Sequence, residues 1–328
     1  MDMRSLAGGW SCIVTLAVLA PMSLRSAEPD EVVREAEGLL EKGQAAEARK
    51  LLEPAAAANP KAPRIQFALA KAAILEKDFP RARKHLEKAV DLEPGNSPVR
   101  MVLASIYRRE KKPKDAAKQL EAVLKADPKN SGALIGMGEL EGDAKRHDKA
   151  AGWYEKALAL RPNDLRLASL VATAWTESVK ALRDGLKKQR DAQGDKALAA
   201  WRRVLELKPE FDDIHFNLGT ILILLERYDE AVKCLKTFIE KRPEDGHGLF
   251  NLAQALEKDG KGKEALEVWH RFLALAEEDK ELKADIPQAK EHIKKLEKNP
   301  KGSEADKKDP KETKSRKEKK EQPPKVGL

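Results

Sequence analysis

Small and bulky apolar residues recur along this chain at a fixed interval of 34 residues. We count positions from Pro29, the first residue of the first repeat. Position eight is then alanine or glycine, position 20 is alanine, and position 24 is bulky. A period of this length indicates one supersecondary unit that is repeated and stacked as a solenoid. The alanines at position 20 are Ala48, Ala82, Ala116, Ala150, Ala197, Ala231 and Ala265, with one longer step of 47 residues after Ala150.

Each repeat is predicted to form two helices joined by a turn. In the sixth repeat, Ile214, Leu218, Ile221 and Leu225 are three or four residues apart, which is the spacing of one helix face. A proline at position 32 ends the second helix, because proline lacks the amide hydrogen and its ring clashes with the preceding turn. These prolines are Pro60, Pro94, Pro128, Pro162, Pro209 and Pro243.

The small residues at positions eight and 20 predict that the paired helices approach each other closely. A larger side chain there would overpack the contact at a cost of roughly 1–3 kcal/mol. The bulky residues at position 24 are Leu52, Leu86, Leu120, Tyr154, Trp201, Leu235 and Trp269.

Two repeats carry the clearest motifs. The sixth has Asn217-Leu218-Gly219 followed by Tyr228-Asp229-Glu230-Ala231, and the third has Leu103-Ala104 followed by Tyr107. This pattern resembles the tetratricopeptide repeat family over about residues 29–277. The resemblance implies an all-α fold, a right-handed α-solenoid of about seven helix-turn-helix repeats. The repeats are predicted near residues 29–62, 63–96, 97–130, 131–164, 165–211, 212–245 and 246–279.

The fifth repeat is thirteen residues longer than the others. Val179, Leu182 and Leu186 have helical spacing, so we expect an extended first helix through about residues 177–193 and then a loop near Gln193-Gly194-Asp195. The insertion is either a protruding arm that contacts a partner or a second copy, or a tolerated insertion at a loop, since such growth costs little.

A capping helix is predicted at about residues 285–298, because the terminal unit of a solenoid needs a polar outer face. Asp285 is expected to cap this helix and Pro287 to lie in its first turn. Ile293 and Leu296 provide its apolar edge.

The first 27 residues have the character of a secretory signal. Arg4 precedes a short uncharged apolar run, Pro21 breaks it, and Ser26-Ala27 offers small residues before Glu28. The run is too short to span a bilayer comfortably. We therefore expect an exported protein, periplasmic or secreted, with no transmembrane helix after cleavage. The alternative is an uncleaved signal that tethers the chain to the membrane, because Arg25 stands where a small residue is usual.

Residues 299–328 are predicted to be a disordered basic tail. They contain nine lysines and one arginine against six acids, so about half of the formal net charge of +8 lies there. The tail is expected either to bind an anionic surface, such as phospholipid or an envelope polymer, or only to aid solubility. We do not expect the tail to bind nucleic acid, because no aromatic residues are interleaved with the lysines.

The sequence contains no motif of a catalytic or cofactor site. His-Glu-x-x-His, Gly-x-Ser-x-Gly, a nucleotide-binding glycine loop and a dinucleotide fingerprint are all missing. The six histidines are scattered and none pairs with another at ligand spacing, so we expect no metal and no cofactor. An enzyme whose site residues converge only in three dimensions is the remaining alternative.

The family resemblance implies that the first helices line a concave groove, into which positions two, five, nine, twelve and thirteen point. Position five reads Val33, Phe67, Met101, Ile135, Ser169, Phe216 and Phe250, with Asn217, Thr220, Asn251 and Gln254 as polar neighbours. This row is expected to bind a segment of another protein. Alternatively, it only mediates contact between adjacent first helices.

Three hypotheses for function follow. The first is an exported bacterial protein that acts as a non-catalytic scaffold or adaptor in the cell envelope. It would bind peptide or helical segments of other proteins. The second is an envelope tether anchored by the basic tail. The third is an enzyme with an unrecognised site.

Overall fold

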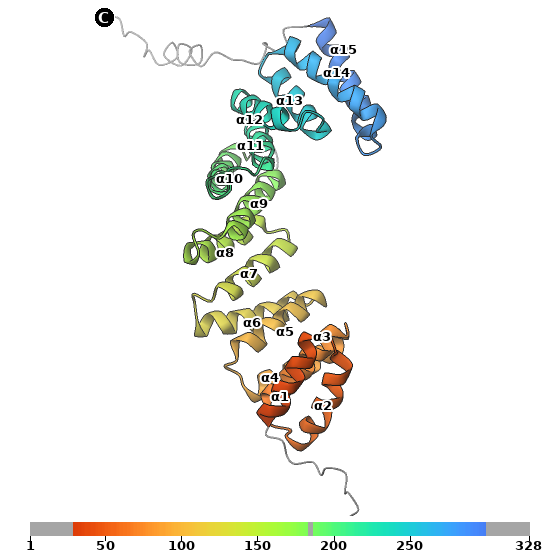
Figure 1. Cartoon of the computed structure of the whole chain (residues 1–328). Helices are drawn as coiled ribbons and strands as arrows, with labels where there is room; N and C mark the ends of the chain where they lie inside the picture. Colours follow the sequence, from red (N-terminus) through yellow and green to blue (C-terminus); the bar gives the residue numbers. More distant parts are fainter. Residues whose placement is uncertain (1–28, 183–185, 300–328) are drawn as a thin grey trace, which may run out of the picture. The chain divides into compact units, whose positions relative to one another are not determined.

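A computed structural model describes residues 29–182 and 186–299 of the chain. In these two stretches every regular element is a helix, as Figure 1 shows. The fold class is therefore all-α, as the period predicts. The predicted signal, residues 1–27, and the predicted tail, apart from Asn299, lie outside the described residues.

Helices alternate along the chain as the first and second members of successive hairpins. The first members are α1 (Pro29–Glu41), α3 (Pro63–Leu75), α5 (Ser97–Arg109), α7 (Ser131–Asp143), α9 (Leu165–Ala181), α11 (Asp213–Leu224) and α13 (Gly246–Lys258). The second members are α2 (Ala45–Ala58), α4 (Phe79–Leu92), α6 (Pro113–Ala126), α8 (His147–Leu160), α10 (Lys187–Leu207), α12 (Tyr228–Lys241) and α14 (Gly262–Glu278).

Position 15 forms the turn inside six of the seven hairpins. Its φ is positive in each, at Gly43, Gly260 and four residues with side chains. The amide of position 16 donates to the carbonyl five residues back at 2.8–2.9 Å, which is the bond that closes a Schellman motif. These bonds offset the cost of the left-handed conformation, which is about 1–2 kcal/mol for a residue with a side chain. The four residues with side chains are Lys77, Lys111, Lys145 and Glu226.

The proline at position 32 marks where each second helix ends. The residue before it leaves the helical region, for example at Glu93 with φ −136° and ψ 79° and at Lys208 with φ −147° and ψ 79°. The steric clash of a proline with its predecessor explains this conformation. The seventh repeat has Glu277 in place of proline, and its second helix α14 runs for 17 residues, against 14 in α12.

The contact between positions eight and 24 forms the centre of each hairpin. All seven side chains at position 24 are buried, and so are the small residues at positions eight and 20. A Cβ added to Gly219 would lie 2.5 Å from Leu235 Cγ, and one added to Gly138 would lie 2.4 Å from Tyr154 Cε1. The small residues are therefore required by the close approach of the two helices, as the sequence predicts.

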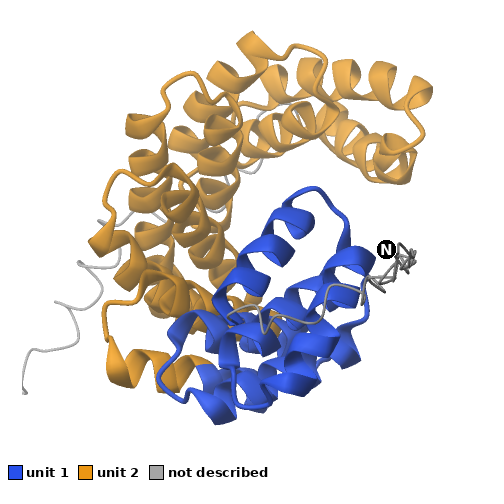
Figure 2. Cartoon of the chain, turned by 60° about the horizontal axis from the view of Figure 1, so that its bottom comes forward, with its two compact units in different colours: residues 1–119 blue, residues 120–328 orange. Residues whose placement is uncertain are grey.

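The chain divides into two compact units, drawn in separate colours in Figure 2. Unit 1 contains the described residues up to Gln119, and unit 2 those from Leu120 onward. Within unit 1, each helix from α1 to α4 packs on the one that follows it, and α1 also contacts α3. Within unit 2, a continuous apolar core runs from α8 to α15.

Polar bonds between neighbouring repeats follow the same period. The Glu87 carboxylate accepts from the Tyr107 hydroxyl at 2.8 Å, and the Glu155 carboxylate accepts from the Trp175 indole at 2.7 Å. Each pair joins position 25 of one repeat to position 11 of the next. Burial, aided by the bond to Glu87, raises the pKa of Tyr107 to about 12.

Ion pairs also connect successive repeats in unit 1. Arg49 pairs with Glu76, and Arg83 pairs with Glu110, each at 3.1 Å. Partly exposed pairs of this kind contribute roughly 0–1 kcal/mol each. Apolar packing therefore dominates the stacking, and the ion pairs add a small contribution.

The insertion in the fifth repeat differs from its prediction. α9 ends at Ala181, and α10 begins at Lys187, so Gln193-Gly194-Asp195 lies inside a helix and the predicted loop is wrong. Position 15 of this repeat is Val179, a β-branched residue that disfavours a positive φ, and α9 continues through it. Gly194 is buried, and a Cβ there would lie 2.4 Å from Leu225 Cδ2. This glycine allows α10 to pack closely on Leu225 at the C-terminal end of α11, and it does not form a turn.

The first half of α10 lies against the hairpin turn of the sixth repeat. Lys187 and Arg190 both pair with Glu226, at 3.2 and 3.0 Å, and Asp195 pairs with Arg227 at 3.3 Å. This part of the insertion therefore braces the next repeat, and does not extend freely as an arm.

The seventh repeat is followed by a 3₁₀ helix, Leu282–Asp285, and by helix α15, Ile286–Lys298. Asp285 stands at the N-cap, but its side chain makes no capping hydrogen bond, so that detail of the prediction is wrong. Its φ of −94° and ψ of −9° continue the preceding 3₁₀ helix instead of the extended conformation that side-chain capping needs. Ile293 and Leu296 are buried.

We predict opposite effects of the same substitution at two glycines of α7. Gly138→Ala should lower the free energy of unfolding by about 1–3 kcal/mol, because the new methyl group overlaps the Tyr154 ring. Gly142→Ala should raise it by up to about 1 kcal/mol, because no atom lies within 4 Å of the added Cβ and alanine favours the helix. Urea unfolding of the two variants measures both changes. Equal effects at the two sites would contradict the close contact.

Candidate functional site

The side chains of the predicted row at position five are only partly exposed, so a partner could contact only part of their surface. Val33 is buried, with 2 % of its surface exposed, and the other six members are half-buried. In unit 2, the Phe216 ring packs on Phe238 with centroids 5.3 Å apart, and the Phe250 ring packs on Trp269 at 5.0 Å. Both rings therefore contact the second helix of their own repeat, a partner that neither hypothesis for the row considered.

The polar neighbours of that row form a bridge between two first helices. Thr220 Oγ1 donates to the Phe216 carbonyl at 2.9 Å and accepts from Asn251 Nδ2 at 3.3 Å. The bridge joins α11 to α13. Asn217 and Gln254 are half-buried beside it, and within the described residues their side chains form no hydrogen bond.

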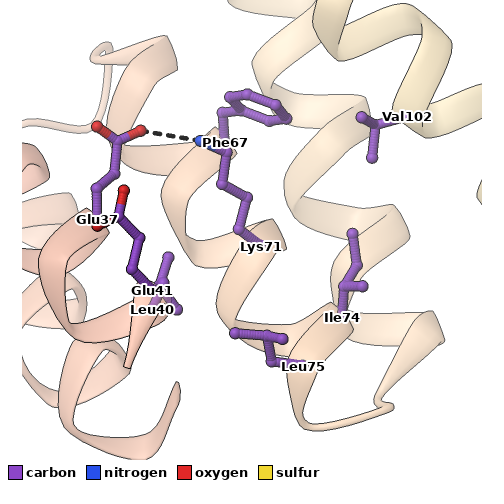
Figure 3. Close-up of a pocket in the computed structure, with 8 residues that line it drawn as sticks. All are labelled: Glu37, Leu40, Glu41, Phe67, Lys71, Ile74, Leu75 and Val102. Carbon is purple, nitrogen blue, oxygen red and sulfur yellow. Dashed lines mark hydrogen bonds and ion pairs between the residues drawn. The ribbon is translucent and has the colours of Figure 1, made fainter. Parts of the chain in front are cut away.

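Unit 1 contains a hollow of about 540 Å³ on the surface of three successive first helices. Figure 3 shows the side chains that line it. We call this hollow the unit 1 groove. It is lined by Glu37, Leu40 and Glu41 from α1, by Phe67, Lys71, Ile74 and Leu75 from α3, and by Val102 from α5.

The floor of the unit 1 groove is apolar. Phe67, Ile74 and Val102 are half-buried and pack against the core beneath α3 and α5. Leu75, the last residue of α3, is 50 % exposed, which is unusual for a large aliphatic side chain in this protein. A single exposed leucine is ordinary, but Leu75 adjoins the apolar floor of the groove, and contiguous apolar surface is a feature of binding sites.

The charges of the unit 1 groove lie on its α1 side and at its centre. Lys71 Nζ is 2.9 Å from Glu37 Oε1, and it also lies 4.7 Å from the centroid of the Phe67 ring. Glu41 is exposed and pairs with no cation within the described residues. The groove thus has apolar contact area together with specific polar points, as peptide-binding surfaces have.

Of the residues predicted for binding, only Phe67 lines the unit 1 groove. Met101 does not line it, and its neighbour Val102 does. Ile135 belongs to unit 2, where it packs half-buried against the apolar core.

The residues that position five missed have their own signal in the sequence. Positions nine, twelve and thirteen of the first two repeats supply six of the eight lining residues, and these positions are among those the family resemblance directs into the groove. The six are Glu37, Leu40, Glu41, Lys71, Ile74 and Leu75.

A second hollow, of about 480 Å³, lies in unit 2 near the end of α14. Carboxylates from Glu244, Glu278 and Asp279 dominate its lining, with two leucines and one lysine. Within residues 29–182 and 186–299, no three His, Cys, Asp or Glu side chains are grouped as ligands for a metal ion. Cys234 is half-buried, and burial raises the pKa of its thiol. The more apolar unit 1 groove is the better candidate site.

None of the helices in the described part of the chain combines the length and the apolar character that crossing a bilayer requires.

Sequence profiles described as tetratricopeptide repeat match most of the chain. One profile matches residues 39–106, and a second matches residues 101–164, 185–233 and 225–280. No curated protein sequence matches the chain.

Among the solved structures similar to this chain, the first two below share its fold. The C-terminal part of a TPR repeat-containing protein from Cytophaga hutchinsonii has a TM-score of 0.60 and 18 % identity, over 80 % of this chain and 99 % of that one. YrrB, described as a TPR protein with an unusual peptide-binding site, has a TM-score of 0.50 and 18 % identity, over 61 % and 96 %. The MamA protein has a TM-score of 0.46 and 19 % identity, over 55 % and 92 %.

Proposed function

Because the chain belongs to the tetratricopeptide repeat family, we propose that it is a non-catalytic scaffold that binds a segment of another protein in the unit 1 groove. The observation that carries the proposal is the half-buried apolar floor of the hollow on α1, α3 and α5, with Leu75 half exposed at its edge. Burying such a surface is what an amphipathic helix or an extended peptide gains on binding. YrrB shares the fold and is described as having a peptide-binding site, which supports the proposal that these repeats bind a peptide segment.

We predict that Leu75→Asp abolishes the binding of partner proteins, because it places a carboxylate on the apolar floor. Leu75 is the last residue of its helix and half exposed, so losing its buried half should lower the free energy of unfolding by about 1 kcal/mol, which leaves the chain folded. The measurement is affinity purification of the full chain from its own cells, followed by identification of the proteins that co-purify.

Leu160→Asp is the matched control. Leu160 is also the last residue of its helix, α8, and is 38 % exposed, but it lies outside the unit 1 groove. Partners that disappear with Leu75→Asp and remain with Leu160→Asp support the proposal. Retention of every partner by both folded variants would reject the groove as the binding site.

We further propose that the protein acts in the cell envelope. The support is the sequence of residues 1–27, in which a basic start precedes a short apolar run and small residues.

We predict that protein recovered from cells begins near Glu28, which N-terminal sequencing and intact mass measure. A chain that keeps Met1 and sediments with membranes would instead indicate an uncleaved anchor.

The lysine-rich segment 299–328 supports a second proposal, an electrostatic tether to an anionic envelope surface. Lysines near such a surface contribute about 1 kcal/mol each.

We predict that the full chain sediments with phosphatidylglycerol vesicles at low ionic strength and that deletion of residues 299–328 prevents this. Neutral phosphatidylcholine vesicles are the control. Equal sedimentation of the full and shortened chains would reject the tether.

A further inference from the structure

The ammonium group of Lys71, at the centre of the unit 1 groove, already has two partners within the protein. The Lys71 ammonium is held by the Glu37 carboxylate at 2.9 Å and by the face of the Phe67 ring at 4.7 Å. A cation between a carboxylate and an aromatic face has both an ionic and a cation–π partner. An acidic ligand would need to break this arrangement before it could use Lys71.

The carboxylate of Glu41 is the free charge of the unit 1 groove. It is exposed, four residues after Glu37 on α1, and unpaired within the described residues. Residues four apart lie on one face of a helix, so Glu41 lies beside the Lys71–Glu37 pair, and the two glutamates and one lysine of the lining leave one net negative charge. The groove therefore presents negative charge to an incoming ligand.

The apolar floor beside this edge has the length of two helical turns. Phe67 and Ile74 are seven residues apart on α3, which places them about 10 Å apart along the helix axis. Figure 3 shows Phe67 and Val102 toward one end of the floor and Leu75 toward the other. Side chains at i, i+4 and i+7 of a ligand helix span the same distance.

We propose that the unit 1 groove binds a basic amphipathic helix of a partner protein. Its apolar face contacts Phe67, Ile74 and Leu75, and a lysine or arginine on its flank pairs with Glu41. This inference rests on the proposed function, because it states which kind of segment the groove accepts. A segment with acids on the same flank would meet the Glu41 carboxylate, and this repulsion selects against it.

The test uses two synthetic helical peptides of about 18 residues, long enough to be helical in solution. They share leucines at i, i+4 and i+7 and differ only at two flanking positions, which are lysine in one and glutamate in the other. Fluorescence anisotropy with the full chain measures their affinities. We expect the lysine peptide to bind at least about tenfold more tightly, with the difference shrinking at high salt.

Two variants on α1 identify the carboxylate that is responsible. Glu41→Gln should weaken binding of the lysine peptide about two- to fivefold, the range for one exposed ion pair. Glu35→Gln is the matched control, because Glu35 is exposed on the same helix outside the unit 1 groove, and it should leave the affinity unchanged.

Each other outcome would overturn the inference. Equal binding of the two peptides would show a groove without charge selection. No effect of Glu41→Gln would show that Glu41 is not the selecting carboxylate. In both cases the proposed function would stand. Tighter binding of the glutamate peptide that is lost in Lys71→Gln would indicate an acidic partner. If neither peptide binds, the inference is wrong, and the comparison of Leu75→Asp with Leu160→Asp decides the proposed function separately.

Discussion

The close contact between position eight and position 24 is the constraint on which the other features of this protein depend. A small residue on the first helix lies directly beneath a bulky side chain on the second, as with Gly219 and Leu235. The approach is closer than a Cβ would allow at the two glycines and leaves the alanines of the other repeats fully enclosed. Because the helices of a hairpin meet along this line, one face of each first helix remains available to the neighbouring repeat or to a ligand.

The turns of the hairpins show how one conformation sets the length of the helices. A left-handed residue at position 15 ends the first helix in six repeats and returns the chain into the second. In the fifth repeat Val179 occupies that position, and both helices become longer. The added part of α10 then packs on the turn of the sixth repeat through Gly194 and three ion pairs. An insertion that a single sequence presents as a loop has become a packing element.

The unit 1 groove follows from the same geometry. Its apolar floor runs along α3 from Phe67 to Leu75, and the period places Leu40 of α1 and Ile74 of α3 at the same position, position twelve. Its charges differ from repeat to repeat, since the residue equivalent to Lys71 is Glu37 in the first repeat. Under the proposed function, the shared positions would set where a partner segment binds, and the residues that vary would set which segment is accepted.

The sequence by itself determined the all-α class, the period, the ends of most helices and the small residues of the helix contacts. These features depend on spacing along the chain and on local chemistry, such as the missing amide hydrogen of proline. Only the tertiary structure decided that Phe216 and Phe250 pack within their own repeats and that Gly194 lies inside a helix. It also decided that Lys71 is already paired, while Glu41 has no cationic partner among the described residues. The reason is that each of these depends on distances between side chains from different helices, which the spacing of residues along one chain does not contain.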